Sequence, residues 1–275
     1  MRVAFSNLAC PGWSLDQAVA AAREWGYEGI ELRLLNGEVI PLALPPEHQA
    51  MIRETLERAG LSPVAFDTSI RLVGDEDESA VCEAIRAALT LAKTLGAPMI
   101  RVFGGPFAPE EAWEAVRARA ARILNRAAPW AEETGVAIAL ETHDSFASGE
   151  RVAAVLDMVP SRAVGALWDT LHPFRVGETP DATMRLLGDR LMLVHIKDAR
   201  VDGPAWELCL LGEGNVPVRA ILGLLAQHGY RGWLSVEWEK RWHPELADPA
   251  VALPQHVQVL REWLAAIGQE RREAE

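Results

Sequence analysis

Eight short apolar runs, separated by segments with helical periodicity, constrain the fold of this chain more than any other feature. Each run is bounded by glycine, proline or polar residues, as buried strands are. Strands that alternate with helices pair in parallel through crossover connections, and eight such units predict a closed (β/α)8 barrel. The runs are RVAFS (2–6), GIELR (29–33), PVAFD (63–67), MIRVF (99–103), AIALE (137–141), VGALWD (164–169), LMLVHI (191–196) and WLSVE (233–237).

The segments between these runs carry start and stop signals of helices. Ser14 is suited to cap the first helix, and Gly26 to end it. A break is expected near Pro129, because proline removes a helical hydrogen bond. Residues 211–217 predict a turn that leads into a helix. The expected helices are 15–25, 77–95, 109–133 and 221–228.

An open, doubly wound sheet is the alternative arrangement of the same elements. That fold usually has a glycine-rich phosphate turn after its first strand, where this chain has SNLACPGW. The 275 residues suit one barrel, which typically needs about 250. No linker-like change of composition divides the chain. We therefore expect a single barrel domain over residues 1–275.

Composition narrows the class of protein. The net charge is −12, whereas nucleic-acid binders usually present an excess of lysine and arginine. We find no apolar run of the length that a signal sequence or a membrane span needs. Only three scattered cysteines occur, which argues against a disulfide framework. We expect a cytoplasmic protein with neither a nucleic-acid nor a membrane partner.

Four of the expected strands carry, at or next to their carboxyl ends, side chains of the kinds that bind divalent cations. They are Glu141, Asp169, His195 and Glu237. The carboxyl ends of barrel strands meet on one face, so these side chains should converge there. Three carboxylates and an imidazole suit a divalent cation such as Mn²⁺, Mg²⁺, Co²⁺ or Zn²⁺. For any one acid alone, an ion pair at the barrel mouth is the alternative.

The motifs around these four residues resemble those of a known family, the xylose isomerase-like TIM barrels, in the branch of sugar phosphate isomerases and epimerases. The resemblance implies one divalent metal ion held by Glu141, Asp169, His195 and Glu237. It also implies that the two glutamates double as acid and base. The motifs are LACPGW (8–13), GYEGIELR (26–33), ETH (141–143), DTLH (169–172), HIKD (195–198) and GYRGWLSVEWE (229–239).

Endonuclease IV, a zinc enzyme that cuts DNA at abasic sites, is another member of this superfamily. Its trinuclear site needs extra histidines after the third and fourth strands, where this chain has Asp67-Thr-Ser and Phe103-Gly-Gly. It also needs a histidine after the seventh strand, and residues 199–215 contain none. Endonuclease activity is therefore not expected.

The resemblance leaves several reactions open, because epimerases, aldose–ketose isomerases, inosose dehydratases and hydroxypyruvate isomerases share this frame. A metal ion can chelate the carbonyl and hydroxyl oxygens of a ketose and stabilise its enediolate. Glu141 and Glu237 could then remove and return the proton. We expect a metal-dependent sugar or sugar phosphate isomerase or epimerase. The alternatives are an inosose-type dehydratase and a non-catalytic carbohydrate-binding barrel.

Four further residues close to the proposed ligands are candidate substrate contacts. Each has a structural alternative, either a plain loop histidine or a surface salt bridge. Glu31 and Arg33 are expected to pair with each other. The expected partner is a small sugar or sugar phosphate, and a homodimer is the usual state of such barrels. The candidate substrate contacts are His143, His172, Lys197 and Arg200.

Overall fold

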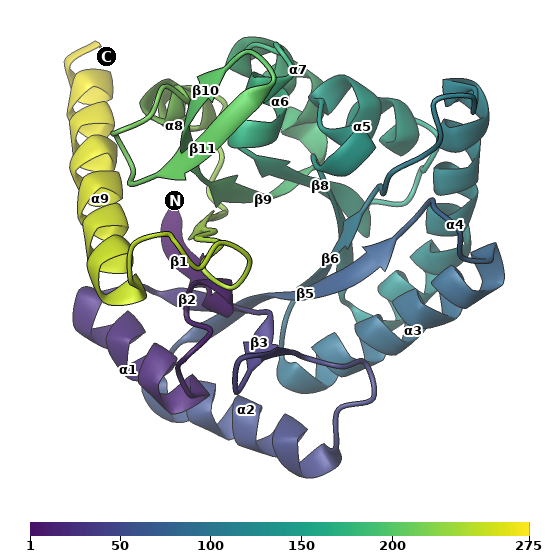
Figure 1. Ribbon diagram of the computed structural model, residues 1–275, viewed down its shortest axis with the longest axis horizontal. Helices are drawn as coiled ribbons and strands as arrows, with labels where there is room; N and C mark the ends of the chain where they lie inside the picture. Colours follow the sequence, from purple (N-terminus) through teal and green to yellow (C-terminus); the bar gives the residue numbers. More distant parts are fainter. Residues whose placement is uncertain (275) are drawn as a thin grey trace.

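Eight parallel strands form a closed barrel, and the helices surround it (Figure 1). This computed structural model describes residues 1–274. The strands are β1 (Arg2–Ser6), β2 (Gly29–Leu32), β5 (Ser62–Arg71), β6 (Met99–Phe103), β7 (Ala137–Glu141), β8 (Val164–Asp169), β9 (Leu191–Ile196) and β12 (Trp233–Val236). Their order around the barrel is β1, β12, β9, β8, β7, β6, β5 and β2. The predicted (β/α)8 barrel is confirmed.

The helices form an outer layer around these strands (Figure 1). In the first of them, the Ser14 hydroxyl accepts from the Gln17 N–H at 3.2 Å, and the Gln17 side chain accepts from the Ser14 N–H at 2.8 Å. This capping box and the left-handed Gly26 (φ 81°) give the bounds that the sequence predicted. The helices are α1 (Leu15–Trp25), α2 (Pro46–Ala59), α3 (Glu78–Leu95), α4 (Trp113–Thr134), α5 (Gly149–Leu156), α6 (Leu171–Arg175), α7 (Pro180–Leu187), α8 (Val218–Gln227) and α9 (Pro249–Ala274).

Helix α4 differs from its prediction in two respects. It begins at Trp113, because the preceding residues form a turn in which the Glu111 N–H donates to the Ala108 carbonyl at 3.0 Å. The expected break at Pro129 was wrong, since the helix continues through the proline. Packing of the surrounding turns outweighs the hydrogen bond that proline removes. The buried alanines on these turns are Ala127, Ala128 and Ala131.

Two short hairpins accompany the barrel. One joins β3 (Leu34–Leu35) to β4 (Glu38–Val39), and the other joins β10 (Asp198–Asp202) to β11 (Ala205–Cys209). The sequence did not predict the second hairpin, because its strands lie outside the eight apolar runs. It turns at Gly203, whose positive φ of 58° favours glycine. Figure 1 shows this hairpin beside α8 at the top of the barrel.

The side chains inside the barrel change from apolar to polar along the strands. A small apolar cluster fills part of it, and includes Ala4, Ala65, Met99, Ala139, Leu167 and Leu193. Side chains alternate along a strand, so residues two positions further on face the same interior. Those residues are Ser6, Asp67, Arg101, Glu141, Asp169 and His195. The apolar layer therefore forms the floor under a polar, chemically active layer at the carboxyl ends of the strands.

The three cysteines are all buried and free, as their spacing predicted. Within residues 1–274, none of the helices combines the length and the apolar character that crossing a bilayer would need.

Candidate active site

The four predicted metal ligands meet inside the barrel. One potential ligand atom from each of Glu141, Asp169, His195 and Glu237 lies within 4.8 Å of all the others. All four side chains are buried. His195 Nδ1 lies 3.0 Å from Glu141 Oε1 and 3.2 Å from Glu237 Oε2. The structure thus brings together the ligand set that the sequence indicated.

This donor set fits a divalent cation. Three carboxylates crowded into a buried space repel one another, and a buried charge is costly unless a counter-charge is near. Two more buried acids, Glu31 and Asp67, lie beside His195 in a second cluster of potential ligands. Among residues 1–274, Glu31 Oε1 and Asp67 Oδ1 have no hydrogen-bond partner. A cation between the carboxylates would offset this excess of negative charge.

Glu31 holds the far side of the His195 ring. His195 Nε2 lies 3.1 Å from Glu31 Oε2, and neither side chain is exposed to solvent. The expected Glu31–Arg33 pair was therefore wrong. Glu31 lies on β2 and reaches the His195 ring, whereas Arg33 follows the end of that strand. The Arg33 guanidinium donates instead to the Asp67 carbonyl and to Ser69 Oγ, each at 2.9 Å.

The charges in the cluster shift one another's protonation. Burial opposes protonation of His195, but the carboxylates of Glu237, Glu31 and Glu141 outweigh it and raise its pKa well above the usual range. Burial also disfavours a charged Glu237, yet His195 and Lys197 hold its pKa well below the usual range. Burial and the adjacent Glu31 raise the pKa of Asp67. Glu237 is thus held in its ionised carboxylate form.

Lys197, a predicted substrate contact, is buried among the acids. Its Nζ lies 2.9 Å from Asp169 Oδ2 and 2.5 Å from Glu237 Oε2, and it also contacts Glu239. These carboxylates outweigh burial and raise the pKa of Lys197 well above its usual range. The lysine is therefore a fixed positive charge against two of the proposed ligands.

The two predicted histidine contacts lie side by side, with ring centroids 4.4 Å apart. His143 Nδ1 is 3.0 Å from Asp144 Oδ1. His172 Nδ1 accepts from Arg175 Nε at 2.8 Å, and burial holds the pKa of His172 well below the usual range. Within the described chain, His172 Nε2 has no hydrogen-bond partner. A neutral His172 is left with one unused N–H donor.

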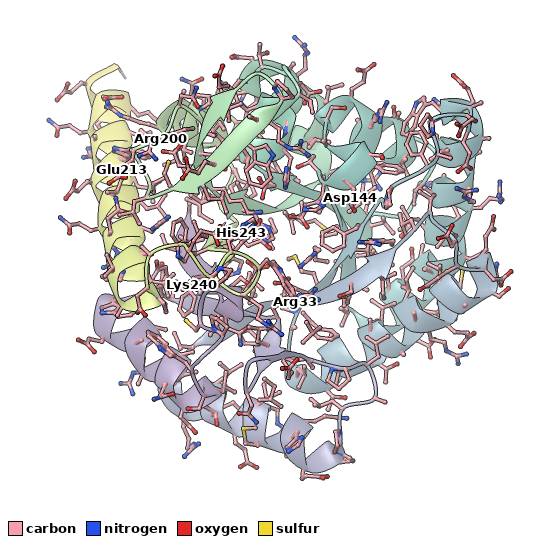
Figure 2. The ribbon with its side chains drawn as sticks, viewed as in Figure 1. Arg33, Asp144, Arg200, Glu213, Lys240 and His243 are labelled. Atoms are coloured by element: carbon pink, nitrogen blue, oxygen red, sulfur yellow. The ribbon has the colours of Figure 1, made fainter. Side chains whose placement is uncertain are left out.

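Arg200, the fourth predicted substrate contact, is not brought to this site. It lies on β10, is exposed, and pairs with Glu213 at 3.5 Å. Figure 2 shows this pair beside α9, apart from Arg33 and Asp144.

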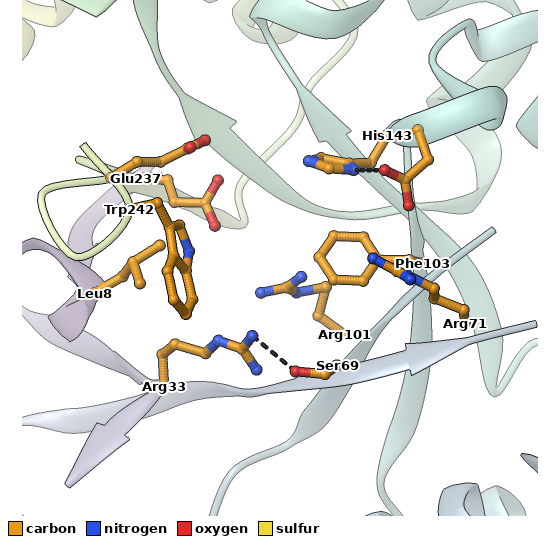
Figure 3. A pocket seen from close by; sticks show the side chains of 11 residues that line it. Leu8, Arg33, Ser69, Arg71, Arg101, Phe103, His143, Glu237 and Trp242 are labelled. Atoms are coloured by element: carbon orange, nitrogen blue, oxygen red, sulfur yellow. Dashed lines mark hydrogen bonds and ion pairs between the residues drawn. The ribbon is translucent and has the colours of Figure 1, made fainter. Parts of the chain in front are cut away.

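A cavity of about 450 Å³ opens above the cluster, within the usual range for small-molecule sites. Glu237 and Glu239 line one side of it, and Arg33 and Arg101 line another. Figure 3 shows the two arginines facing Glu237 across this space. The aromatic rings of Phe103 and Trp242 complete the wall. An aromatic surface beside fixed charges suits a small polar molecule with an apolar face.

Several charged residues of the site were not predicted from the sequence. A signal for them was present, because each lies in or at the end of an apolar run: Glu31 in GIEL, Asp67 in VAFD and Arg101 in MIRVF. A charge inside a strand that is buried on both faces must point into a polar interior. Glu239 carried no such signal, since it lies in a loop beyond β12.

The sequence matches the family model of xylose isomerase-like TIM barrels over residues 19–263. The chain belongs to this family. The resemblance read from its motifs is therefore confirmed.

Relatives in the family include sugar epimerases and inosose dehydratases. The rhizopine catabolism protein MocC of Rhizobium meliloti is 28% identical, and the match covers 92% of this chain and 83% of MocC. The fructoselysine 3-epimerase of Escherichia coli O157:H7 is 24% identical, covering 81% and 85%. The inosose dehydratase of Clostridium tetani is 26% identical, but the match spans only 54% of this chain and 52% of that enzyme.

Solved structures share the fold across the whole chain. L-ribulose 3-epimerase superposes with a TM-score of 0.81 at 18% identity, covering 100% of this chain and 98% of the other. The IolI protein with a bound zinc atom gives a TM-score of 0.79 at 18% identity, covering 97% and 98%. At this level of identity, the likeness concerns the fold.

Proposed function

We propose that this protein is a divalent-metal-dependent isomerase or epimerase of a small carbohydrate. The observation that carries the proposal is the position of two glutamates. Glu141 and Glu237 flank His195 Nδ1 at 3.0 and 3.2 Å, below a cavity of about 450 Å³. A divalent cation held by these residues and Asp169 would act as a Lewis acid that makes the C–H beside a substrate carbonyl more acidic.

The two glutamates then move the proton. Glu237 lines the cavity and, as a carboxylate, would accept a proton from the substrate carbon. Glu141 comes from β7, which two strands, β9 and β8, separate from β12 around the barrel. Burial opposes its charge, but Arg101 and His195 hold its pKa low. A proton taken on one side and returned on the other inverts the carbon, and one returned to the neighbouring carbon moves the carbonyl.

The histidines beside the cluster orient the substrate. The free Nε2–H of His172 would donate to a substrate hydroxyl, because a buried donor without a partner is costly. His143 lines the cavity and would contact a neighbouring hydroxyl. Lys197 would hold Asp169 and Glu237 in place through its contacts with both carboxylates and would interact with a substrate oxygen next to them. Arg200 has no part in this proposal because it is exposed on the hairpin.

A dehydratase is the second candidate, favoured by the position of Lys197. Its buried ammonium contacts Glu237 at 2.5 Å, so it could protonate a departing β-hydroxyl group after Glu237 removes the proton from the adjacent carbon. The inosose dehydratase relative is consistent with this reaction. The products distinguish the two, since dehydration leaves a deoxy keto compound and epimerisation does not.

Proton exchange tests the proposed function directly. Purified protein should bind a divalent ion and, with it, should incorporate solvent deuterium into at least one of a panel of ketoses and ketose phosphates. A chelator should stop the exchange, and added metal should restore it. Water loss with a deoxy product would favour the dehydratase. A protein that binds its ligand unchanged in Mn²⁺ and exchanges no proton over hours would be a binding barrel, and the proposal would fail.

A further inference from the structure

The cavity above the cluster has a cationic wall that the proposed proton transfer does not use. Arg33 and Arg101 both line it, and both are at least nine-tenths buried, with exposures of 5% and 2%. Figure 3 shows the two guanidinium groups facing the same space, with Ser69 beside Arg33. Arg71 lines the cavity further out and is exposed.

Arg33 is a buried cation without an ion pair. Its guanidinium donates to two neutral acceptors, the Asp67 main-chain carbonyl and Ser69 Oγ, each at 2.9 Å. Within residues 1–274, no carboxylate oxygen forms a salt bridge with it, and Arg33 Nε has no hydrogen-bond partner. Burying a charge without an ion-pair partner costs free energy, and an anionic ligand would supply that partner.

Arg101 adds a second cation close to the first. It pairs with Glu141 Oε2 at 3.5 Å and stacks over the Phe103 ring at 4.0 Å. Among the described residues, Arg101 Nε forms no hydrogen bond. Burial, followed by the charge of Arg101, lowers the pKa of Arg33 to about 10. The two guanidinium groups repel each other on the same cavity wall, which costs free energy. An anion bound between them would offset this repulsion.

The opposite side of the cavity is acidic. Glu237 and Glu239 line it, and the first of them belongs to the proposed metal cluster. A ligand with an anionic group would therefore enter in one orientation, with its anion on Arg33 and Arg101 and its reacting carbons towards Glu237. The opposite charges on the two walls thus determine the orientation of a bound anionic ligand.

We infer that the substrate carries a carboxylate or phosphate group, and that Arg33 and Arg101 form the subsite that binds it. This inference rests on the proposed function, because it names the class of substrate for the same site. Both anions present planar or tetrahedral oxygens that a guanidinium binds through paired hydrogen bonds. A neutral sugar would leave Arg33 without an ion-pair partner.

The alternative is that both arginines only balance the buried acids. Arg101 cannot decide between these roles, because it touches the proposed ligand Glu141. Arg33 can, since it pairs with no carboxylate in the described chain. The informative variant is Arg33→Met, with Arg33→Lys as the version that retains the charge. Arg53→Met is the control, because Arg53 lies exposed on α2 and pairs only with its helix neighbour Glu57.

The test is titration calorimetry of the metal-loaded protein with three small probes. Glycerate and glyceramide have nearly the same shape and differ in charge, and inorganic phosphate represents the second anion. We expect glycerate or phosphate to bind the wild type, and Arg33→Met to weaken that binding roughly 10- to 100-fold, the loss expected for hydrogen bonds to a charged group. Arg33→Lys should retain more of the affinity, and Arg53→Met all of it. Glyceramide should respond to none of these changes.

The outcomes separate the two anions and the two hypotheses. If Arg33→Met weakens the binding of glycerate alone, the substrate carries a carboxylate. If it weakens the binding of phosphate alone, the substrate carries a phosphate. Equal affinity of wild type and Arg33→Met for every probe, including no binding to either, overturns the inference. Metal content and proton exchange on neutral ketoses are measured on the same preparations. If the protein binds metal and exchanges protons but its anion binding does not depend on Arg33, only this inference is wrong. If it binds no metal but binds anions in an Arg33-dependent way, only the proposed function is wrong.

Discussion

His195 lies between carboxylates on both of its nitrogens, and this arrangement determines how the ring can serve a metal ion. With Glu31 Oε2 3.1 Å from Nε2, the neutral ring keeps its proton on Nε2 and leaves the Nδ1 lone pair facing Glu141 and Glu237. A carboxylate behind a ligating histidine fixes the tautomer and orients the ring. Glu31 would therefore be a positioning residue.

Replacing this carboxylate should weaken metal binding while leaving the four ligands in place. We expect Glu31→Gln to lower metal affinity about 10- to 100-fold, the usual effect of losing such a partner, as measured by competition with a chelating dye. Glu28→Gln is the matched control, because Glu28 precedes the same strand but pairs with Arg2 outside the site. Unchanged affinity in Glu31→Gln would show that the ring needs no such support.

The proposed acid–base pair makes a different prediction. Glutamine keeps an oxygen donor but cannot take a proton at neutral pH. Glu141→Gln and Glu237→Gln should each lower turnover by at least about 10²–10⁴-fold even at saturating metal, the range of general acid–base contributions. Asp169→Asn removes a ligand charge but no proposed proton carrier, so excess Mn²⁺ should restore part of its activity. If excess Mn²⁺ restored the activity of all three variants equally, the two glutamates would act only as metal ligands and not as acid and base.

At this scale, the sequence identified the four proposed ligands but not the charged residues that lie beside them in space. Glu141, Asp169 and His195 lie at or next to the ends of apolar runs, so their position could be predicted from the pattern alone. Glu31 and Arg101 lie within such runs, and their contacts depend on which strands are neighbours. The pairing of Glu31 with His195 spans 164 positions, a distance over which local pattern carries no information.

Among the elements, α9 supports the site through a buried histidine. His256 Nδ1 lies 2.6 Å from the Ala252 carbonyl, and its ring packs 5.2 Å from that of Trp238. Trp238 directly follows Glu237 in the chain. Burial lowers the pKa of His256 to about 4, so the folded protein holds it neutral at neutral pH.

This histidine makes folding stability depend on pH. Its pKa is lower in the folded state than in the unfolded state, where it is about 6.5. Its contribution is therefore complete above pH 6.5 and is lost as the pH falls towards 4. Between pH 7.5 and 5 the free energy of unfolding should fall by about 2 kcal/mol from this group alone. Urea unfolding should show that His256→Leu lacks this part of the decrease, and parallel pH profiles would contradict the argument.

The helices show where local signals suffice and where packing decides. The bounds of α1 follow from a capping box and a left-handed glycine, both visible in the sequence. Pro129 was misread, because the local rule omits the tertiary packing of α4. The β10–β11 hairpin was missed although a glycine at the first position of a two-residue loop, here Gly203, is typical of hairpins, since its two strands lie outside the barrel repeat.

At the level of the whole molecule, the barrel could be predicted because its strands are buried on both faces and its units repeat. The same closure explains the layered interior. In six of the eight strands, the position two residues beyond the apolar floor holds Ser, Asp, Arg, Glu, Asp or His. The fold therefore concentrates charge at one end of the barrel, and the apolar floor below it supplies a rigid support.

That concentration of charge predicts how metal should affect the stability of the entire chain. The ligands come from β7, β8 and β9 and from the residue that follows β12, so a bound cation links four of the eight strands. It also removes repulsion that favours unfolding. A ligand that binds only the folded state at about 100 times its Kd adds about 2.7 kcal/mol, which for a chain of this size raises Tm by roughly 5–10 °C. Calorimetry with and without Mn²⁺ should show this rise in the wild type, and a much smaller one in Asp169→Asn. Melting that is unaffected by divalent ions would mean that Lys197 and the arginines already balance the cluster, and that it is not a metal site.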